Sequence, residues 1–247
     1  MALKTRSAMG RGMRGGVLAV VGVALAGGTL AAATDDGPTL GAARSFSVLG
    51  ASTVTSAGMT VVTGDLGVSP GTAITGFLPA IVVDGAIHAG DTAAEAAHAD
   101  AAIAYGYLEG MESLTANNLT GTDLGGLTLK PGVYKFNTSA FLTGDLVLDA
   151  GGDSNALFVF QMGSTLITSI GSTVTVINGG EDYDESRVFW QVGSSATLAI
   201  DTRFTGNILA YASITIVAGT TISGSALALN GAVTMDTNCV TSPPVVE

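Results

Sequence analysis

Short runs in which apolar residues alternate with threonine or serine recur along most of the chain, separated by Gly, Asn, Asp and Ser. A period of two is typical of β-strands that bury one face, because successive side chains point to opposite sides of a strand. The runs are Phe46–Leu49, Ser52–Thr55, Thr60–Thr63, Val133–Phe136, Ala140–Leu148, Ala156–Met162, Thr165–Ile170, Thr173–Ile177, Val188–Val192, Ala196–Ile200, Phe204–Leu209, Ser213–Val217, Thr221–Ser225 and Val233–Met235. Strands of this length between such turns predict a mainly β fold, a β-solenoid with three faces.

A five-residue unit supports the same prediction. It consists of an apolar residue, Thr or Ser, Gly, a short polar residue and a second apolar residue. Four copies and a looser fifth are Val62–Leu66, Leu142–Leu146, Phe204–Ile208, Ile222–Ala226 and Val83–Ile87. Repeats with drifting spacing are typical of stacked coils whose corners carry variable insertions. Equivalent outward side chains would then repeat at the inter-strand spacing of roughly 4.7–4.9 Å.

The alternation also predicts which side chains face outward. We take Val54, Leu166, Leu198, Ile214 and Val233 as inward. Their neighbours Thr53, Thr55, Thr165, Thr197, Thr215 and Thr234 are then outward and are expected to form one column. A slip of one residue in the strand register would reverse every one of these assignments.

One stretch departs from the β pattern. Residues 91–114 are rich in alanine, contain no proline and place apolar residues at spacings of three and four. The stripe consists of Ala93, Ala97, Ala101, Ala104, Leu108 and Met111. This spacing predicts a helix of roughly six turns, and its small side chains predict close packing alongside the solenoid. Thr92 and Glu95 predict a capping box, to which Asp91 adds negative charge. The segment 67–79 before it, rich in Gly and Pro, predicts irregular structure.

The first 33 residues have the features of a secretory signal peptide. A leader with four basic residues precedes the apolar, glycine-containing run Val17–Leu30 and the small residues Ala31–Ala33. The run is shorter than the roughly 20 residues of a membrane span. We therefore expect a signal peptide (1–33), a linker (34–44), one solenoid domain (45–240) and a C-terminal tail (241–247). The tail shows no obvious wall-anchoring signal, so the expected destination is the extracellular medium.

The charge balance narrows the choice of partners. The leader holds four of the nine Lys and Arg residues and none of the twenty Asp and Glu residues, which leaves a net charge of −15. A surface of this sign repels phosphate groups, so nucleic acid and anionic membranes are not expected as partners. Cys239 is the only cysteine, so no intrachain disulfide can form. We expect a monomer stabilised by packing and backbone hydrogen bonds.

Six strings of this sequence resemble the secreted microbial ice-binding proteins. They are GDLGVSPGTAITGF at 64–77, AIHAGDTAAEAAHADAAIAY at 86–105, LGGLTLKPGVYKF at 124–136, VFWQVGSSATL at 188–198, FTGNILA at 204–210 and NGAVTMDTN at 230–238. The resemblance covers essentially all of 45–238 in the same order. It implies a discontinuous right-handed β-solenoid with a long helix packed along it, in which the first coil lies beside the last. Thr53 and Thr55 would then lie near Thr234.

The resemblance further implies that the chain binds ice crystals through one flat, Thr-rich face, without catalysis or a cofactor. Some strong members of the family carry Thr-(Ala/Gly)-x-(Thr/Asn) where the ice-facing strand turns the corner. Here the comparable corners are Ala57–Thr60, Ile170–Thr173 and Ala218–Thr221, and each lacks the leading threonine. Moderate or weak inhibition of ice growth or recrystallisation is therefore expected. The corner residues Thr60, Ser172 and Thr220 complete the candidate ice-binding residues.

Other chemistry in the sequence has a simpler structural interpretation. His88 and His98 are ten residues apart, which is not a metal-ligand spacing on a helix, so we expect them to be structural or surface residues. The loop Glu181–Glu185 concentrates four carboxylates that could hold calcium, but it lacks the glycine spacing of an EF-hand. We therefore expect a solvated corner and no metal site.

Two alternatives to ice binding remain open from the residues alone. Many right-handed solenoids degrade polysaccharides, which requires convergent carboxylates with Lys or Arg. Asp65, Asp145 and Asn207 share one position of the repeated unit and could stack, but the repeat itself explains them. The second alternative is an extracellular adhesive solenoid that binds glycans, in which tyrosines and Trp190 would contact sugars. Trp190 lies inside a predicted strand and is expected to be buried or half-buried.

Overall fold

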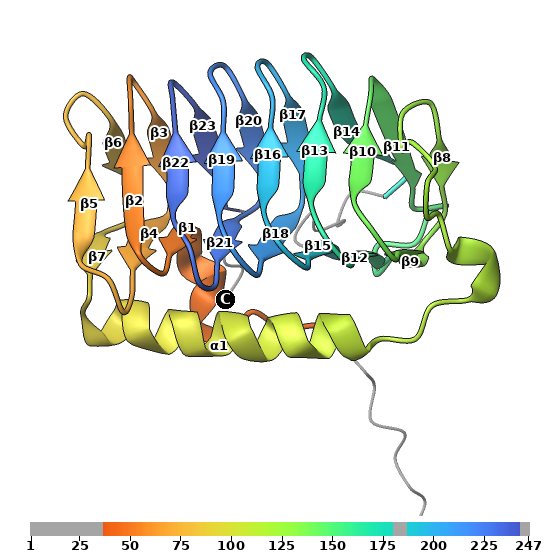
Figure 1. Ribbon diagram of the computed structural model, residues 1–247, viewed down its shortest axis with the longest axis horizontal. Coiled ribbons are helices and arrows are strands. Elements are labelled where there is room, and N and C mark those ends of the chain that lie inside the picture. The colour runs from red at the N-terminus through yellow and green to blue at the C-terminus, as the bar shows by residue number, and fades with distance from the viewer. Residues whose placement is uncertain (1–36, 180–186, 243–247) are drawn as a thin grey trace, which may run out of the picture. The chain divides into compact units, whose positions relative to one another are not determined.

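The alternating strands wind into three parallel β-sheets, as a computed structural model of the chain shows (Figure 1). The structure describes residues 37–179 and 187–242. The predicted signal peptide, the first residues of the predicted linker, the acidic loop 181–185 and most of the predicted tail lie outside these ranges. The residues in these two ranges form one compact unit. The fold is the predicted three-faced β-solenoid with one long helix.

Each sheet collects one strand from each turn of the solenoid. Sheet A has the order β7 (Ile87–Ala89), β4 (Asp65–Val68), β1 (Phe46–Gly50), β21 (Ala226–Ala228), β18 (Asn207–Ala210), β15 (Val188–Val192), β12 (Phe158–Met162) and β9 (Gly132–Phe136). Sheet B has the order β10 (Ala140–Leu142), β13 (Leu166–Thr168), β16 (Ala196–Leu198), β19 (Ile214–Ile216), β22 (Val233–Met235), β2 (Thr53–Ser56) and β5 (Ala73–Thr75). Sheet C has the order β6 (Ile81–Val83), β3 (Val61–Thr63), β23 (Cys239–Thr241), β20 (Thr221–Ser223), β17 (Arg203–Thr205), β14 (Thr173–Ile177), β11 (Asp145–Asp149) and β8 (Thr128–Leu129).

The chain does not wind continuously from one end of the stack to the other. Its first coil, β1 to β3, pairs with the last coil, β21 to β23, and the chain then runs outward to β7 at one end. Helix α1 (Thr92–Gly110) runs back along the stack, and the remaining coils return from β8 and β9 at the far end (Figure 1). The expected closure of the first coil beside the last is therefore confirmed.

The repeated five-residue unit proves to be a strand, a corner and the next strand. In four of its five copies it connects sheet C to sheet A, as at Gly64, Gly206 and Gly224, where φ is +112°, +112° and +139°. A Cβ on Gly224 would lie 2.2 Å from the backbone oxygen of Gly206 in the neighbouring coil. Glycine is therefore required both by the conformation and by the close approach of the coils. The copy at 142–146 instead connects sheet B to sheet C.

These corners correct several predicted strand boundaries. The single strands expected at 140–148 and 204–209 are each divided by a corner into two strands that belong to different sheets. The segment 67–79 was expected to be irregular but contains β5, an edge strand of sheet B. A three-residue strand carries too little alternation to stand out from its flanking turns, and β6, β7 and β23 escaped prediction for the same reason.

Helix α1 covers the outer face of sheet A. Its buried side chains are Ala94, Ala97, Ala101, Ala104, Tyr105 and Leu108, which pack on an apolar layer that includes Leu49, Leu209 and Leu227. Most of the predicted stripe is confirmed, although Ala94 replaces the exposed Ala93 and the helix ends at Gly110. The N-cap is Asp91, whose side chain accepts a hydrogen bond from the amide of Ala94, so the predicted capping box at Thr92 is wrong. The central strands of sheet A are thus buried on both sides.

The segment expected as a linker is partly packed on the domain. Residues Gly41–Ser45 form a short 3₁₀ helix, η1, and Leu40 and Ala43 are buried in the same apolar layer as α1. The amide of Ala42 donates a hydrogen bond to the carboxylate of Asp100 on α1. Residues 40–45 therefore help to fasten the helix to the solenoid. A second 3₁₀ helix, η2 (Thr115–Asn117), follows α1.

The interior of the solenoid is a continuous apolar core in which like side chains stack from coil to coil. Tyr134, Phe160 and Trp190 occupy equivalent positions of β9, β12 and β15, and the Phe160 and Trp190 rings stack with centroids 4.0 Å apart. Trp190 is fully buried, as predicted, and its indole N–H donates to the carbonyl of Thr205. Such stacking removes aromatic surface from water and fixes the rise between coils. Within the described residues, no helix is long and apolar enough to cross a membrane.

Candidate functional site

A row of five threonines crosses the outer face of sheet B. The strand register brings together Thr197, Thr215, Thr234, Thr55 and Thr75, one from each of five adjacent strands. Thr234 and Thr75 are exposed, and the other three are partly exposed. Neighbouring strands in a sheet are roughly 4.7–4.9 Å apart, so the hydroxyl and methyl groups repeat at that interval. The row continues at its other end through Ile167 and Phe141.

The inward assignments of the sequence are confirmed. Val54, Leu166, Leu198, Ile214 and Val233 have no exposed surface. Because the inward residues are correct, the alternating neighbours in these strands face outward. The side of the sheet that each of these residues faces was therefore predictable from the sequence.

The predicted threonines form two rows rather than one column. Thr53 pairs with Ala73, and the Thr165 hydroxyl donates a hydrogen bond of 2.7 Å to that of Ser139. Thr53 lies two positions before Thr55, and Thr165 lies two positions before Ile167. Both therefore belong to a second row beside the central one. This second row contains Ser139, Thr165, Ser195, Ser213, Ala232, Thr53 and Ala73. The outer face of sheet B thus carries two adjacent rows of small, mostly hydroxyl-bearing side chains.

The corner residues Thr60, Ser172 and Thr220 do not lie on this face. All three are fully buried, which corrects their place among the candidate ice-binding residues. Their hydroxyls bind backbone groups of the corner between sheets B and C: Thr220 donates to the carbonyl of Ala199, Ser172 donates to that of Leu142, and the Thr60 oxygen accepts from the amide of Asn238. A buried corner needs such partners because its backbone groups have left the sheet ladders.

Three members of the central row were not predicted. Thr75 was missed because its three-residue strand lies in the segment expected to be irregular. Phe141 and Ile167 were missed because the search followed hydroxyl-bearing residues. Their side chains are 48% and 37% exposed, so the sheet ends in an uncovered apolar patch beside the threonines.

The three sheets differ in what they present to the solvent. Sheet A is covered by α1, η1 and their apolar contacts. The outer face of sheet C carries Asp145, Asp149 and Arg203. The two rows on sheet B contain no charged residue. Sheet B is therefore the uncharged and uncovered face.

The two histidines have structural partners. His88 Nδ1 lies 2.8 Å from Asp91 Oδ2, and His98 Nε2 lies 2.9 Å from the backbone oxygen of Leu229. The pKa of Asp91 is lowered, chiefly by the hydrogen bond from the Ala94 amide and then by His88. These contacts fix the start and the middle of α1. The described residues contain no group of three or more potential metal-ligating side chains.

The polar positions of the repeated unit do not converge. Asp145 lies in sheet C, where its carboxylate accepts a hydrogen bond of 2.7 Å from Thr173, whereas Asp65 and Asn207 lie in sheet A. Strands β1 and β21 separate β4 from β18, so even Asp65 and Asn207 are not neighbours. These three residues therefore do not stack, and their shared position in the repeated unit is explained by the repeat itself, as expected.

Comparisons with known proteins agree on one family. A family model described as "Ice-binding-like" matches residues 48–241. An ice-binding protein of Nostoc sp. (strain HG1) is 55% identical over 210 residues, which cover 83% of this chain and 76% of the relative. The crystal structure of an ice-binding protein from the Antarctic ascomycete Antarctomyces psychrotrophicus has a TM-score of 0.79 at 40% identity and covers 84% of this chain and 99% of its own. An Arctic yeast ice-binding protein has a TM-score of 0.76 at 29% identity, covering 86% and 97%.

Proposed function

Because the chain belongs to the ice-binding-like family, we propose that it adsorbs to ice through the outer face of sheet B and inhibits ice growth or recrystallisation. The observation that carries this proposal is the in-register row from Thr197 to Thr75 on the uncharged, uncovered sheet. The rows contain Thr55, Thr215 and Thr234 at the centre, with Thr53 and Thr165 beside them.

The physical problem for such a site is that ice is itself water. Simple burial of apolar surface is therefore a weak basis for selectivity. We infer that threonine methyl groups order the adjacent water while the hydroxyls hold it in a pattern that merges with the crystal. Ordering a bound water costs about 0–2 kcal/mol, so the pattern must be repeated and preorganised.

The fold supplies this preorganisation in two ways. Threonine is branched at Cβ and has few χ1 choices, so little side-chain freedom is lost on binding. The strands beneath the row are fixed by parallel ladders and by fully buried residues such as Leu198 and Ile214. Charged side chains, which hold water strongly around themselves, are absent from the two rows on sheet B.

We propose that the activity is moderate or weak. The corners that follow the ice-facing strands begin with Ala57, Ile170 and Ala218 where some strong members of the family carry threonine. In addition, Ile167 and Phe141 interrupt the row of hydroxyl groups after five strands. The regular pattern therefore covers only part of the sheet.

We further propose that the protein works outside the cell, as a monomer and without catalysis. Secretion is supported by the predicted signal peptide at 1–33. A non-catalytic role is supported by the separation of Asp65, Asp145 and Asn207 into different sheets or distant strands. We propose ice as the partner that binds the outer face of sheet B.

The proposal is tested by replacing Thr215 with Tyr or Arg in a fluorescently labelled protein. A large or charged side chain at the centre of the row should abolish partition into growing ice and the shaping of crystals near the melting point. Thr221→Tyr is the matched control, because Thr221 is an exposed threonine on a central strand of sheet C. The melting curve by circular dichroism should be nearly unchanged in all variants. Retained ice partition by Thr215→Tyr and Thr215→Arg would show that sheet B is not the binding face.

A further inference from the structure

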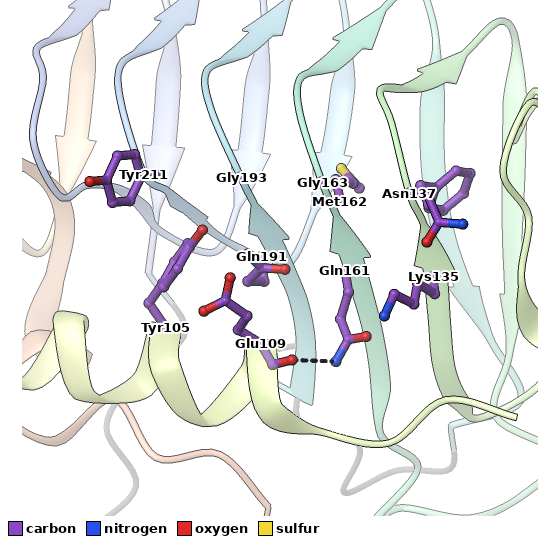
Figure 2. Close-up of a pocket in the computed structure, with 11 residues that line it drawn as sticks. Tyr105, Glu109, Lys135, Asn137, Gln161, Met162, Gly163, Gln191, Gly193 and Tyr211 are labelled. Carbon is purple, nitrogen blue, oxygen red and sulfur yellow. Dashed lines mark hydrogen bonds between the residues drawn. The ribbon is translucent and has the colours of Figure 1, made fainter.

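A polar groove lies outside the sheet B face, beside the last turns of α1 (Figure 2). Its volume is about 500 Å³, within the roughly 300–1,000 Å³ of small-molecule sites. Tyr105 and Glu109 approach it from α1, and Gln161 and Gln191 approach from sheet A. Tyr211 bounds one end, at the corner between β18 and β19.

The groove exists because the corner between sheets A and B lacks side chains in its middle. Successive coils place Asn137, Gly163, Gly193 and Tyr211 along this corner. A Cβ on Gly163 would lie 2.5 Å from the backbone oxygen of Asn137, and one on Gly193 would lie 2.7 Å from that of Met162. The close stacking of the coils therefore requires glycine at both positions. The hollow between Asn137 and Tyr211 is a consequence of the packing of the backbone.

The floor of the groove is polar where the helix leaves the sheet. Lys135, Gln161 and Gln191 are in register on the outer face of sheet A, and the next position in the row is the buried Leu209 under α1. Gln161 Nε2 donates to the carbonyls of Leu108 and Met111 at 2.6 and 2.7 Å, which fixes its amide against the helix end. The Gln191 side chain lines the groove beside Tyr105. Both glutamines are almost fully buried, and the Gln161 amide is held in a fixed orientation.

The rim carries two charged groups without an ion-pair partner among the described residues, and an exposed aromatic ring. Neither the Lys135 ammonium nor the Glu109 carboxylate forms an ion pair with a described residue. Tyr211 is 54% exposed, and its ring centroid lies 6.3 Å from that of Tyr105. The packing of the solenoid does not account for an exposed aromatic ring beside buried amides and two charges that lack an ion-pair partner in the described part of the chain.

We propose that this groove binds a saccharide of one or two sugar units. The face of a pyranose ring is lined by C–H groups that pack on an aromatic ring such as Tyr211, while its edge carries neighbouring hydroxyls. A carboxylate accepts from two such hydroxyls, an ammonium donates to them, and an amide does both, as Glu109, Lys135 and Gln191 could do here. Asn137 and Tyr211 lie at the two ends of the short groove, so we infer that it takes the end of a sugar chain rather than its middle. The site would allow the protein to be held on extracellular polysaccharide while sheet B stays free.

The test is a printed array of neutral, N-acetylated and uronic mono- to hexasaccharides, followed by calorimetric titration of the protein with each sugar that binds. We expect binding that is at least about ten-fold weaker in Tyr211→Ala and in Glu109→Gln. Tyr107→Ala is the control, because Tyr107 is an exposed tyrosine of the same helix that does not line the groove. If the groove recognises the end of the sugar chain that the array leaves free, the dissolved sugar and the immobilised sugar should bind equally.

Two outcomes would overturn the saccharide site. One is the absence of any sugar that binds at millimolar concentration, and the other is sugar binding that survives both groove substitutions. The site is independent of ice binding, so Tyr211→Ala should partition into ice like the unmodified protein. Conversely, Thr215→Tyr should bind sugar normally even though its ice partition is lost. Failure of one proposal is thereby distinguished from failure of the other.

Discussion

Thr55 lies directly beside Thr234 on the outer face of sheet B, although one belongs to the first coil of the solenoid and the other to the last. The pairing of β2 with β22 makes the central row continuous across the junction of the two parts of the chain. If the row is the ice-binding site, substitutions on either side of this junction should reduce ice binding equally.

Thr55→Tyr should therefore reduce ice partition as strongly as Thr215→Tyr. Both side chains occupy the central row, and a tyrosine at either position would hold the face away from a flat crystal. The measurement is the amount of labelled protein taken into a slowly grown ice hemisphere. Normal partition of Thr55→Tyr, alongside loss in Thr215→Tyr, would restrict the site to the C-terminal coils.

The double substitution Phe141→Thr with Ile167→Thr should increase activity. It would extend the threonine row from five strands to seven, and both side chains are exposed enough that their loss should cost little stability. Thermal hysteresis and recrystallisation assays would measure the change. Ile177→Thr, at an exposed position on sheet C, is the control and should have no effect. Reduced activity in the double variant would mean that the apolar end of the sheet takes part in binding.

The sequence was sufficient to predict the three-faced solenoid, the inward residues and most of the helix stripe. These features depend on periodicity over many residues, and one face of each strand must be apolar for the core to form. Burial of Trp190 was predictable for the same reason. Closure of the first coil beside the last came from the family resemblance, because no local pattern records which coils are neighbours.

The corners were not predictable from alternation. At Gly171, Asp201 and Gly219 the backbone adopts positive φ, and the chain turns from sheet B into sheet C. After such a turn the period of two no longer applies, so the following Ser172 and Thr220 point inward although they read as surface residues. A buried hydroxyl that binds a corner carbonyl looks the same in the sequence as an exposed one.

Thr60→Val should destabilise the protein without changing ice binding. The Thr60 oxygen accepts from the Asn238 amide at 3.2 Å and from the Ser56 hydroxyl at 2.8 Å, and both Thr60 and Asn238 are buried. An amide left without an acceptor costs about 1–3 kcal/mol of unfolding free energy. Thr221→Val, at an exposed site, should change it by less than about 0.5 kcal/mol. Denaturant unfolding measures both values. Loss of ice partition in folded Thr60→Val would return this corner to the binding site.

Asp149 should make the stability of the solenoid depend on pH, with stability lost in acid. Its pKa is lowered from 3.8 to about 2, first by the hydrogen bond from Lys130 and then by that from Asn178. Between these two values the unfolded chain binds more protons than the folded one, so this contribution is complete above the unfolded pKa and is lost as the pH falls toward 2. Asp149→Asn should therefore melt below the unmodified protein at pH 7, and the gap should narrow on acidification. Asp84→Asn, at an exposed corner without an ion pair to a described residue, is the control substitution. Replacing a charge-dependent contact must leave a melting-temperature difference that varies with pH. A difference that stayed constant from pH 5 to pH 2 would show that the charge of the Asp149 carboxylate does not contribute to stability.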